Sequence, residues 1–294
     1  MRAIRVGLVS YSVAFFGTIL LLLAALGLTG CAETIPGYGH VDGKYITEFD
    51  WEFDAQGVEK LEIATTNGNV DVKGDPSADS IRVHARMRVR APSDEEARAF
   101  GEKVLVKAER EGSVVRAFHK TPRRRPRTDV SVSFTVTAPT RILDVELEAT
   151  HGNVTSNGLA GAARLRTTNG NVVFHGSGGP FELETTNGNV EAVFARMVES
   201  GELETTNGSI RCTVRDELKT LSMKTTNGSI DLEIPPDAAG QLDARTTHGN
   251  VSSEIPVAVT ESKRAQLVGP LGGGGPIRIT ARTTNGDIRL STIR

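Results

Sequence analysis

The sequence predicts an all-β fold, a right-handed parallel β-helix (β-solenoid) of about 18–21 residues per turn, with one short helix in an N-terminal insertion. The first reason is a motif, Thr-Thr-Asn-Gly-Asn-Val, that recurs eight times with small changes. A fixed period is typical of folds in which each turn buries its apolar face only against its neighbours. The motif glycines, separated by 84, 18, 18, 20, 20, 21 and 37 residues, are Gly68, Gly152, Gly170, Gly188, Gly208, Gly228, Gly249 and Gly286.

The second reason is that apolar residues fall into columns when the repeats are aligned on the motif asparagine. Stacked columns make one continuous core, in which a buried aliphatic side chain contributes about 1.5–3 kcal/mol. Alternation alone would also fit a β-meander of type I′ hairpins, so the period and the columns together favour the solenoid. A left-handed hexapeptide helix would need a six-residue subperiod, which is absent, and right-handed coiling is therefore expected. The columns are Ile63, Leu147, Leu165, Leu183, Leu203, Met223, Ala244 and Ala281, four residues before the asparagine, and Val70, Val154, Val172, Val190, Ile210, Ile230, Val251 and Ile288, three residues after it.

Each motif residue has a predicted role. The first threonine is expected to face the core, and Asn-Gly is expected to turn the corner with positive φ. His151 and His248 replace the asparagine in two repeats. We interpret them as corner residues too, because histidine is enriched at positive φ and their neighbours at the turn supply no further metal ligands.

The N-terminus is predicted to be a lipoprotein signal peptide, residues 1–30. Arg2 and Arg5 precede an apolar run at residues 6–28, and the sequence Leu-Thr-Gly-Cys ends at Cys31. Small residues before a cysteine at the end of an apolar run resemble the lipobox of bacterial lipoproteins. The resemblance implies cleavage before Cys31 and its acylation, and this lipidation site is the one site residue predicted. An uncleaved transmembrane anchor is the alternative, because the run is longer than the usual signal-peptide core.

The predicted anchor sets the expected domain organisation and location. Residues 31–45 are polar and contain glycine, and are predicted to be a tether; residues 46–294 are predicted to be a single solenoid domain. Two or three acyl chains would hold the protein stably on a membrane through Cys31. Ala32 follows the cysteine, which by resemblance to enterobacterial sorting favours the outer membrane. The predicted location is therefore the bacterial cell envelope.

Two intervals depart from the period. The first is predicted to be an insertion, residues 75–140, at the N-terminal end of the solenoid. Strict alternation at residues 81–89 predicts a strand, and Ser-Asp-Glu-Glu at residues 93–96 is a capping box that predicts a helix at about residues 94–103. Residues 123–127, Arg-Arg-Arg-Pro-Arg, indicate an exposed basic loop. The last interval, of 37 residues, is predicted to hold two turns, one of which has lost its Asn-Gly.

The charge balance argues against general nucleic-acid binding. The chain has 34 Lys and Arg against 36 Asp and Glu, and cleavage would remove two arginines and leave a net charge near −4. Cys212, the other cysteine, is interpreted as a small core residue. No metal or cofactor is predicted, because the remaining histidines are scattered: His40, His84, His119 and His175.

A column of mostly charged residues directly before the threonine pair is predicted to face outward. We interpret it as a solvated face, with a glycan or anion site as the alternative. Its members are Glu148, Arg166, Glu184, Glu204, Lys224, Arg245 and Arg282.

The repeats resemble a bacterial putative-adhesin family, a domain of unknown function with Thr-x-Asn-Gly repeats followed by Val or Ile. The similarity runs from about residue 49 to residue 290 and includes the insertion. It implies a β-solenoid, often with a signal or membrane anchor, and it implies adhesion only through the family's name. No ligand-binding residues carry over, because fold alone does not give function.

The expected function is a lipid-anchored, non-enzymatic adhesive or structural protein whose partners are the membrane and an envelope glycan or surface protein. A carbohydrate-active β-helix lyase or hydrolase is one alternative, and it needs clustered carboxylates on adjacent turns. Asp231 and Glu233 share a strand, but Arg211 and Thr213 occupy their positions one turn earlier. The other alternative is an envelope scaffold or signalling partner whose basic loop docks on an acidic surface.

Overall fold

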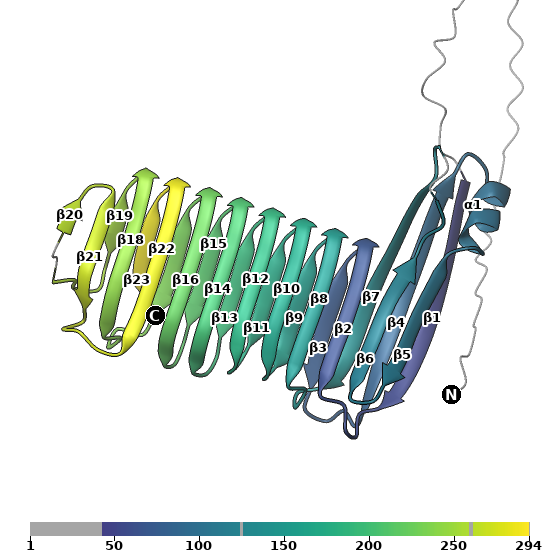
Figure 1. Ribbon diagram of the computed structural model, residues 1–294, viewed down its shortest axis with the longest axis horizontal. Coiled ribbons are helices and arrows are strands. Elements are labelled where there is room, and N and C mark those ends of the chain that lie inside the picture. Colours follow the sequence, from purple (N-terminus) through teal and green to yellow (C-terminus); the bar gives the residue numbers. More distant parts are fainter. Residues whose placement is uncertain (1–42, 124–125, 259–260, 294) are drawn as a thin grey trace, which may run out of the picture.

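The computed structural model describes residues 43–123, 126–258 and 261–293, which form two β-sheets and one helix, α1 (Asp94–Gly101) (Figure 1). The 11-stranded sheet contains, in spatial order, β1 (Gly43–Asp54), β4 (Ser80–Ala91), β7 (Asp129–Pro139), β3 (Val70–Asp75), β9 (Val154–Leu159), β11 (Val172–Gly176), β13 (Val190–Phe194), β15 (Ile210–Val214), β17 (Ile230–Ile234), β23 (Ile288–Thr292) and β19 (Val251–Ser253). The 12-stranded sheet contains β20 (Glu261–Lys263), β21 (Gln266–Leu271), β18 (Gly240–His248), β22 (Ile277–Asn285), β16 (Leu218–Asn227), β14 (Val198–Asn207), β12 (Pro180–Asn187), β10 (Ala162–Asn169), β8 (Asp144–His151), β2 (Lys60–Asn67), β6 (Val114–Lys120) and β5 (Leu105–Glu111).

Each repeat forms one coil: a strand of the 12-stranded sheet, the Asn-Gly corner, and a strand of the 11-stranded sheet. Strand β12 pairs in parallel with β10 and β14, so that Leu183 lies between Leu165 and Leu203. Strand β13 lies in the same way between β11 and β15. A meander would instead pair the two strands of one repeat. The predicted solenoid is therefore confirmed, while its right-handed coiling stays a prediction.

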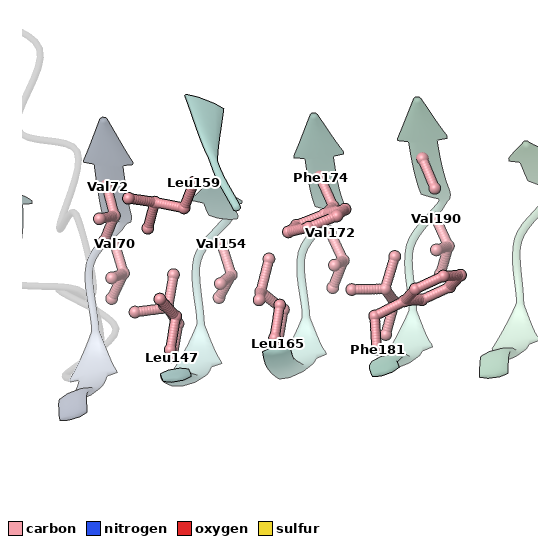
Figure 2. Close-up of a cluster of buried hydrophobic side chains, with 14 of the residues drawn as sticks. Val70, Val72, Leu147, Val154, Leu159, Leu165, Val172, Phe174, Phe181 and Val190 are labelled. Atoms are coloured by element: carbon pink, nitrogen blue, oxygen red, sulfur yellow. The ribbon is translucent and has the colours of Figure 1, made fainter. Parts of the chain in front are cut away.

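The core lies between the two sheets and is built from the predicted apolar columns. Figure 2 shows part of both columns, with Leu147 and Leu165 from one sheet and Val154 and Val172 from the other; all four are fully buried. Larger side chains fill the space beside the columns, and the ring centroids of Phe181 and Phe194 lie 4.1 Å apart.

A glycine in the neighbouring coil makes room for one of these rings. A Cβ on Gly201 would lie 1.9 Å from Cζ of Phe181. Because a Phe side chain in one coil is matched by a missing side chain in the next, the core stays close-packed although the coils differ in sequence.

The coils at the C-terminal end of the stack are not in sequence order. Strand β22 pairs with β16 on one side and β18 on the other, and β23 lies between β17 and β19. The coil of Gly286 therefore separates the coil of Gly228 from the coil of Gly249.

The prediction of a degenerate turn of the solenoid between Gly249 and Gly286 is wrong. In its place, β21 pairs antiparallel with β18, and β20 pairs antiparallel with β21. Because β21 occupies the outer edge of β18, strand β22 of the Gly286 coil pairs with the inner edge of β18. The β20–β21 hairpin also covers a sheet edge that would otherwise be open to another strand.

The insertion extends both sheets at the N-terminal end. Strand β4 of the insertion pairs antiparallel with β1 on one side and with β7 on the other, and β7 joins β3 in parallel. Strand β6 joins β2 in parallel and pairs antiparallel with β5. The predicted helix is confirmed as α1, and Oγ of Ser93 accepts a hydrogen bond from the backbone N of Glu96 at 3.2 Å. Strand β1 begins at Gly43, inside the stretch predicted to be a tether (residues 31–45). Within the described residues, no helix is both long and apolar enough to cross a membrane.

The stacking order predicts that Ile288 contributes more to stability than Val251, which precedes it in the chain. Ile288 is 3% exposed inside the stack, whereas Val251 is only partly buried in the outer coil. We expect Ile288→Ala to lower the free energy of unfolding by about 2–5 kcal/mol and Val251→Ala to lower it by about 1 kcal/mol. Urea unfolding measures both, and equal costs or the reverse ranking would contradict the observed order.

Candidate functional site

The corners beside the outer face of the 12-stranded sheet are fixed by one hydrogen bond between neighbouring coils. At six corners the buried first threonine donates from Oγ1 to the carbonyl oxygen of the adjacent coil's corner glycine. Thr185 reaches Gly170 O at 2.9 Å, and Thr246, in the reordered part, reaches Gly286 O at 2.8 Å. The prediction that this threonine faces inward is confirmed, since it is less than one-tenth exposed in each of the seven coils that contain it.

The corner glycine is required by the same contact. A Cβ on Gly188 would lie 1.9 Å from the carbonyl oxygen of Gly170. The prediction that Asn-Gly turns through positive φ holds for four of the eight corner glycines, Gly68, Gly152, Gly170 and Gly286. It is wrong for the asparagine, because Arg127 is the sole non-glycine residue with positive φ in the described part of the chain. It is equally wrong for His151 and His248, which end strands β8 and β18 in extended conformation.

The corner asparagines form a ladder on the surface. Nδ2 of Asn187 donates to Oδ1 of Asn169 at 2.9 Å, and Nδ2 of Asn207 donates to Oδ1 of Asn187 at 2.9 Å. The residue after the glycine forms a second ladder, in which Oδ1 of Asn171 accepts from the backbone N of Asn189 at 2.8 Å. These bonds link the coils outside the core and hold the corners in register.

The second threonine of each motif is exposed and forms a row along the outer face. Adjacent parallel strands lie about 4.8 Å apart, so the row offers a hydroxyl donor and acceptor at each coil. In spatial order its members are Thr66, Thr150, Thr168, Thr186, Thr206, Thr226, Thr284 and Thr247.

The charged column predicted to face outward lies beside this row. Arg166 pairs with Glu182 and also contacts Glu184, with Nε 3.3 Å from Oε2. Lys224 pairs with Glu204 at 2.6 Å. The hydrogen bond from Arg166 lowers the pKa of the Glu182 carboxyl, so that this group is ionised at neutral pH.

Two depressions on this face are larger than the one beside Thr247 at its C-terminal end. The larger, of about 580 Å³, follows the strands away from the corners and is lined by Lys60, Glu146, Arg164, Glu182, Ser200 and Thr220, among others. The other, of about 510 Å³, lies next to the threonine row at the N-terminal end of the stack and is lined by Phe118, Glu148, Arg166, Thr150, Thr168 and Thr186, among others. We call the second one the threonine groove.

The wall of the threonine groove comes from the insertion. Phe118 in β6 lies opposite Ala64 in β2 and is partly exposed. The next residue, His119, has Nδ1 3.4 Å from Oγ1 of Thr65, and burial lowers the pKa of His119, which keeps the ring neutral at pH 7. Neither residue could be placed beside the repeats from the sequence, because no repeat signal pairs β6 with β2.

The sequence profile of the Toastrack DUF4097 family matches residues 54–291, most of the chain. The chain belongs to this family. The predicted resemblance is therefore confirmed at the level of the family.

Several solved structures resemble this Toastrack protein at low identity. They include a putative cell adhesion protein from Clostridium sporogenes (10% identity, TM-score 0.30, covering 85% of this chain and 100% of that chain). Two others are putative adhesins from Bacteroides fragilis (12%, 0.29, 84% and 97%) and Parabacteroides distasonis (9%, 0.31, 86% and 98%). At these TM-scores the similarity carries no argument about function. No curated protein matches the chain.

The other residues considered from sequence lie apart from the threonine groove. Asp231 is on the outer face of the 11-stranded sheet, where Arg289 lies 3.5 Å from it, and Glu233 accepts a hydrogen bond from Thr213. Cys212 is fully buried in the core, where burial raises the pKa of its thiol. In the described part of the Toastrack chain, no group of three or more His, Cys, Asp or Glu residues is arranged to hold a metal ion. Cys31 and the predicted signal peptide lie outside the described residues.

Removing a buried hydroxyl should affect the free energy of unfolding differently at two positions, because only one of the two hydroxyls makes the threonine–glycine hydrogen bond. Thr205 donates to Gly188 O at 2.9 Å, whereas Ser156, fully buried in β9, has no hydrogen-bond partner among the described residues. Thr205→Val should lower the free energy of unfolding by about 1–3 kcal/mol, because it leaves a carbonyl without its donor. Ser156→Ala should leave the unfolding free energy unchanged or raise it by about 1 kcal/mol. Denaturant unfolding of both variants tests this, and a larger loss for Ser156→Ala would refute it.

Proposed function

We propose that this Toastrack protein is a lipid-anchored, non-enzymatic binding protein of the bacterial cell envelope. Its threonine groove binds a glycan of the envelope or of another cell surface. The observation that carries the proposal is the groove itself, in which one aromatic ring stands beside a row of threonine hydroxyls and a pair of opposite charges.

The chemistry of the groove suits a chain of sugar units. Threonine hydroxyls both donate and accept hydrogen bonds, and Glu148 and Arg166 add a charged acceptor and a charged donor. Phe118 supplies an apolar surface at the end of the row. Because the coils repeat every 4.8 Å or so, successive coils present the same groups to successive units of a linear polymer.

The carboxylates of the face support binding over catalysis. Glu184 lies opposite Glu204, as the predicted outward column has it, and Glu182 lies opposite Glu202, a pair that the column did not include. A glycoside hydrolase needs one carboxyl with a raised pKa to act as general acid. Arg166 and Arg164 both hold Glu182 as an ion pair, and the pKa of Glu182 is lowered instead. The carbohydrate-active enzyme is therefore the less supported alternative.

The location rests on the sequence. The lipobox ending at Cys31 supports a lipid anchor, and Ala32 after it supports the outer membrane. A rigid stack on a short tether would present its faces close to the envelope components that we propose as partners.

Glycan binding by the full chain tests the role of the groove. We expect the wild type to bind isolated envelope polysaccharide, and Phe118→Ala or the double variant Thr168→Val/Thr186→Val to weaken binding about tenfold, because a lost aromatic or hydrogen-bond contact costs about 1–2 kcal/mol. Val173→Ala on the opposite sheet is the matched control and should bind normally. The proposal would be contradicted if the wild type did not bind the polysaccharide, or if both groove variants bound it as well as the wild type.

The anchor is tested separately in cells. Metabolic labelling with a fatty acid should mark the wild type, and Cys31→Ala should abolish the label and release the protein from the membrane fraction if the signal peptide is still cleaved. If Cys31→Ala stays in the membrane at its uncleaved length and wild type is unlabelled, residues 6–28 act as a transmembrane anchor instead.

A further inference from the structure

A small basic depression lies on the outer face of β1, β4 and β7, at the N-terminal end of the 11-stranded sheet. It has a volume of about 150 Å³ and is lined by Lys44, Ile46, Arg86, Arg88, Ser131 and Ser133. These residues come from β1, β4 and β7, at the N-terminal end of the stack (Figure 1). We call this depression the basic pocket.

The cations of the basic pocket are poorly neutralised. Arg86 has Glu48 3.5 Å away, and Oδ1 of Asp94 accepts a hydrogen bond from the backbone N of Lys44 at 2.7 Å. The side chains of Lys44 and Arg88 form no hydrogen bond or ion pair with any described residue. Arg90 lies opposite Lys44 and adds a further positive charge. The nearby carboxylate of Asp129 accepts a hydrogen bond from Asn67 Nδ2 at 3.1 Å.

The positive excess is confined to one end of the face. Further along the same strands, His84 pairs with Asp50 at 2.8 Å and Arg82 lies opposite Glu52. Arg123 and Arg127, the described arginines of the predicted basic loop, are exposed and precede β7, which begins opposite Arg90. The loop therefore leads into the charged end of the face.

We propose that the basic pocket binds phosphate groups of anionic lipids in the membrane that holds Cys31, and so lays this end of the stack on the bilayer. The inference rests on the proposed lipid anchor. The contact is one that the anchor alone does not require, because attachment through Cys31 does not by itself fix how the stack is oriented on the bilayer.

The chemistry of the pocket matches a phosphodiester. Guanidinium and ammonium groups form charge-assisted hydrogen bonds with phosphate oxygens, and the hydroxyls of Ser131 and Ser133 supply neutral donors beside them. Ile46 and the aliphatic stems of the arginines provide an apolar floor suited to the boundary between headgroups and acyl chains.

The position of the pocket along the chain favours a lipid source for the phosphate. Eleven residues, 32–42, separate Cys31 from Gly43, and at about 3.3–3.6 Å per residue they span at most about 40 Å. Lys44 is the second described residue, so the pocket lies at the point where the tether joins the fold. The opposite end of the stack lies many strand spacings further away.

The charge of the remaining protein favours one orientation. The cleaved chain would carry a net charge near −4, so an anionic membrane repels most of its surface and attracts the basic pocket. Each cation near such a surface contributes about 1 kcal/mol, and the effect acts within about one Debye length.

The test places a reporter beside the pocket in the full, lipidated chain. Thr135→Cys introduces an exposed thiol on the same face of β7; Cys212 is buried and Cys31 acylated, so a fluorophore attaches at residue 135 alone. Vesicles of phosphatidylcholine, with or without phosphatidylglycerol, carry headgroup nitroxides that quench the fluorophore at close range. We expect strong quenching when phosphatidylglycerol is present, and its loss at about 1 M salt.

Matched variants separate the pocket from overall charge. Lys44→Gln/Arg88→Gln should lower the ratio of docked to undocked protein about 30-fold, whereas Lys73→Gln/Arg82→Gln, which removes two cations from the same sheet outside the pocket, should leave it within about threefold. Equal quenching in both vesicle types, or equal losses in both double variants, would overturn the proposal.

Vesicle flotation separates this proposal from the anchor. Wild type that floats with phosphatidylcholine alone is anchored, and quenching then decides the docking. If the wild type does not float with phosphatidylcholine alone, the proposed lipid anchor is contradicted. Flotation that requires phosphatidylglycerol and is lost in Lys44→Gln/Arg88→Gln still supports lipid binding by the basic pocket. No flotation with either lipid overturns the basic-pocket proposal.

Discussion

The contact between a threonine hydroxyl and the glycine carbonyl of the next coil is the constraint on which the stack depends. The glycine must lack a side chain because the neighbouring carbonyl lies where its Cβ would be. That carbonyl, in turn, receives the hydroxyl of the buried threonine. One contact therefore selects two of the six motif residues, and it sets both the spacing and the register of adjacent coils.

The remaining motif residues follow from that register. Once the corners are aligned, the asparagine amides can bond to one another along the surface, as Asn187 does to Asn169, and the apolar residues on either side of the corner stack into the core. The outer face contributes less to the stack. Its charges form ion pairs between neighbouring coils, such as Lys224 with Glu204, but exposed pairs of this kind contribute at most about 1 kcal/mol each. The exposed threonines and charges are therefore available for binding.

The sequence was sufficient to predict the solenoid, the inward threonine, the core columns and helix α1, because each depends on local pattern or on the period. It was not sufficient for the stacking order, since the coils of Gly249 and Gly286 carry nearly the same corner and fit the same neighbours. It also missed Phe118 and the basic pocket. Both depend on which strands of the insertion pair with which coil, and Lys44, Arg88 and Ser131 come together only through β1, β4 and β7.

The displaced coil of Gly286 bears on how the protein is made. Along the chain it follows the coil of Gly249, yet in the stack it separates that coil from the coil of Gly228. During synthesis, the earlier coil emerges first and has no permanent neighbour on its inner side. Coil-by-coil growth from the N-terminus can therefore proceed only as far as the coil of Gly228, and the last two coils, those of Gly249 and Gly286, must assemble together after both have been synthesised.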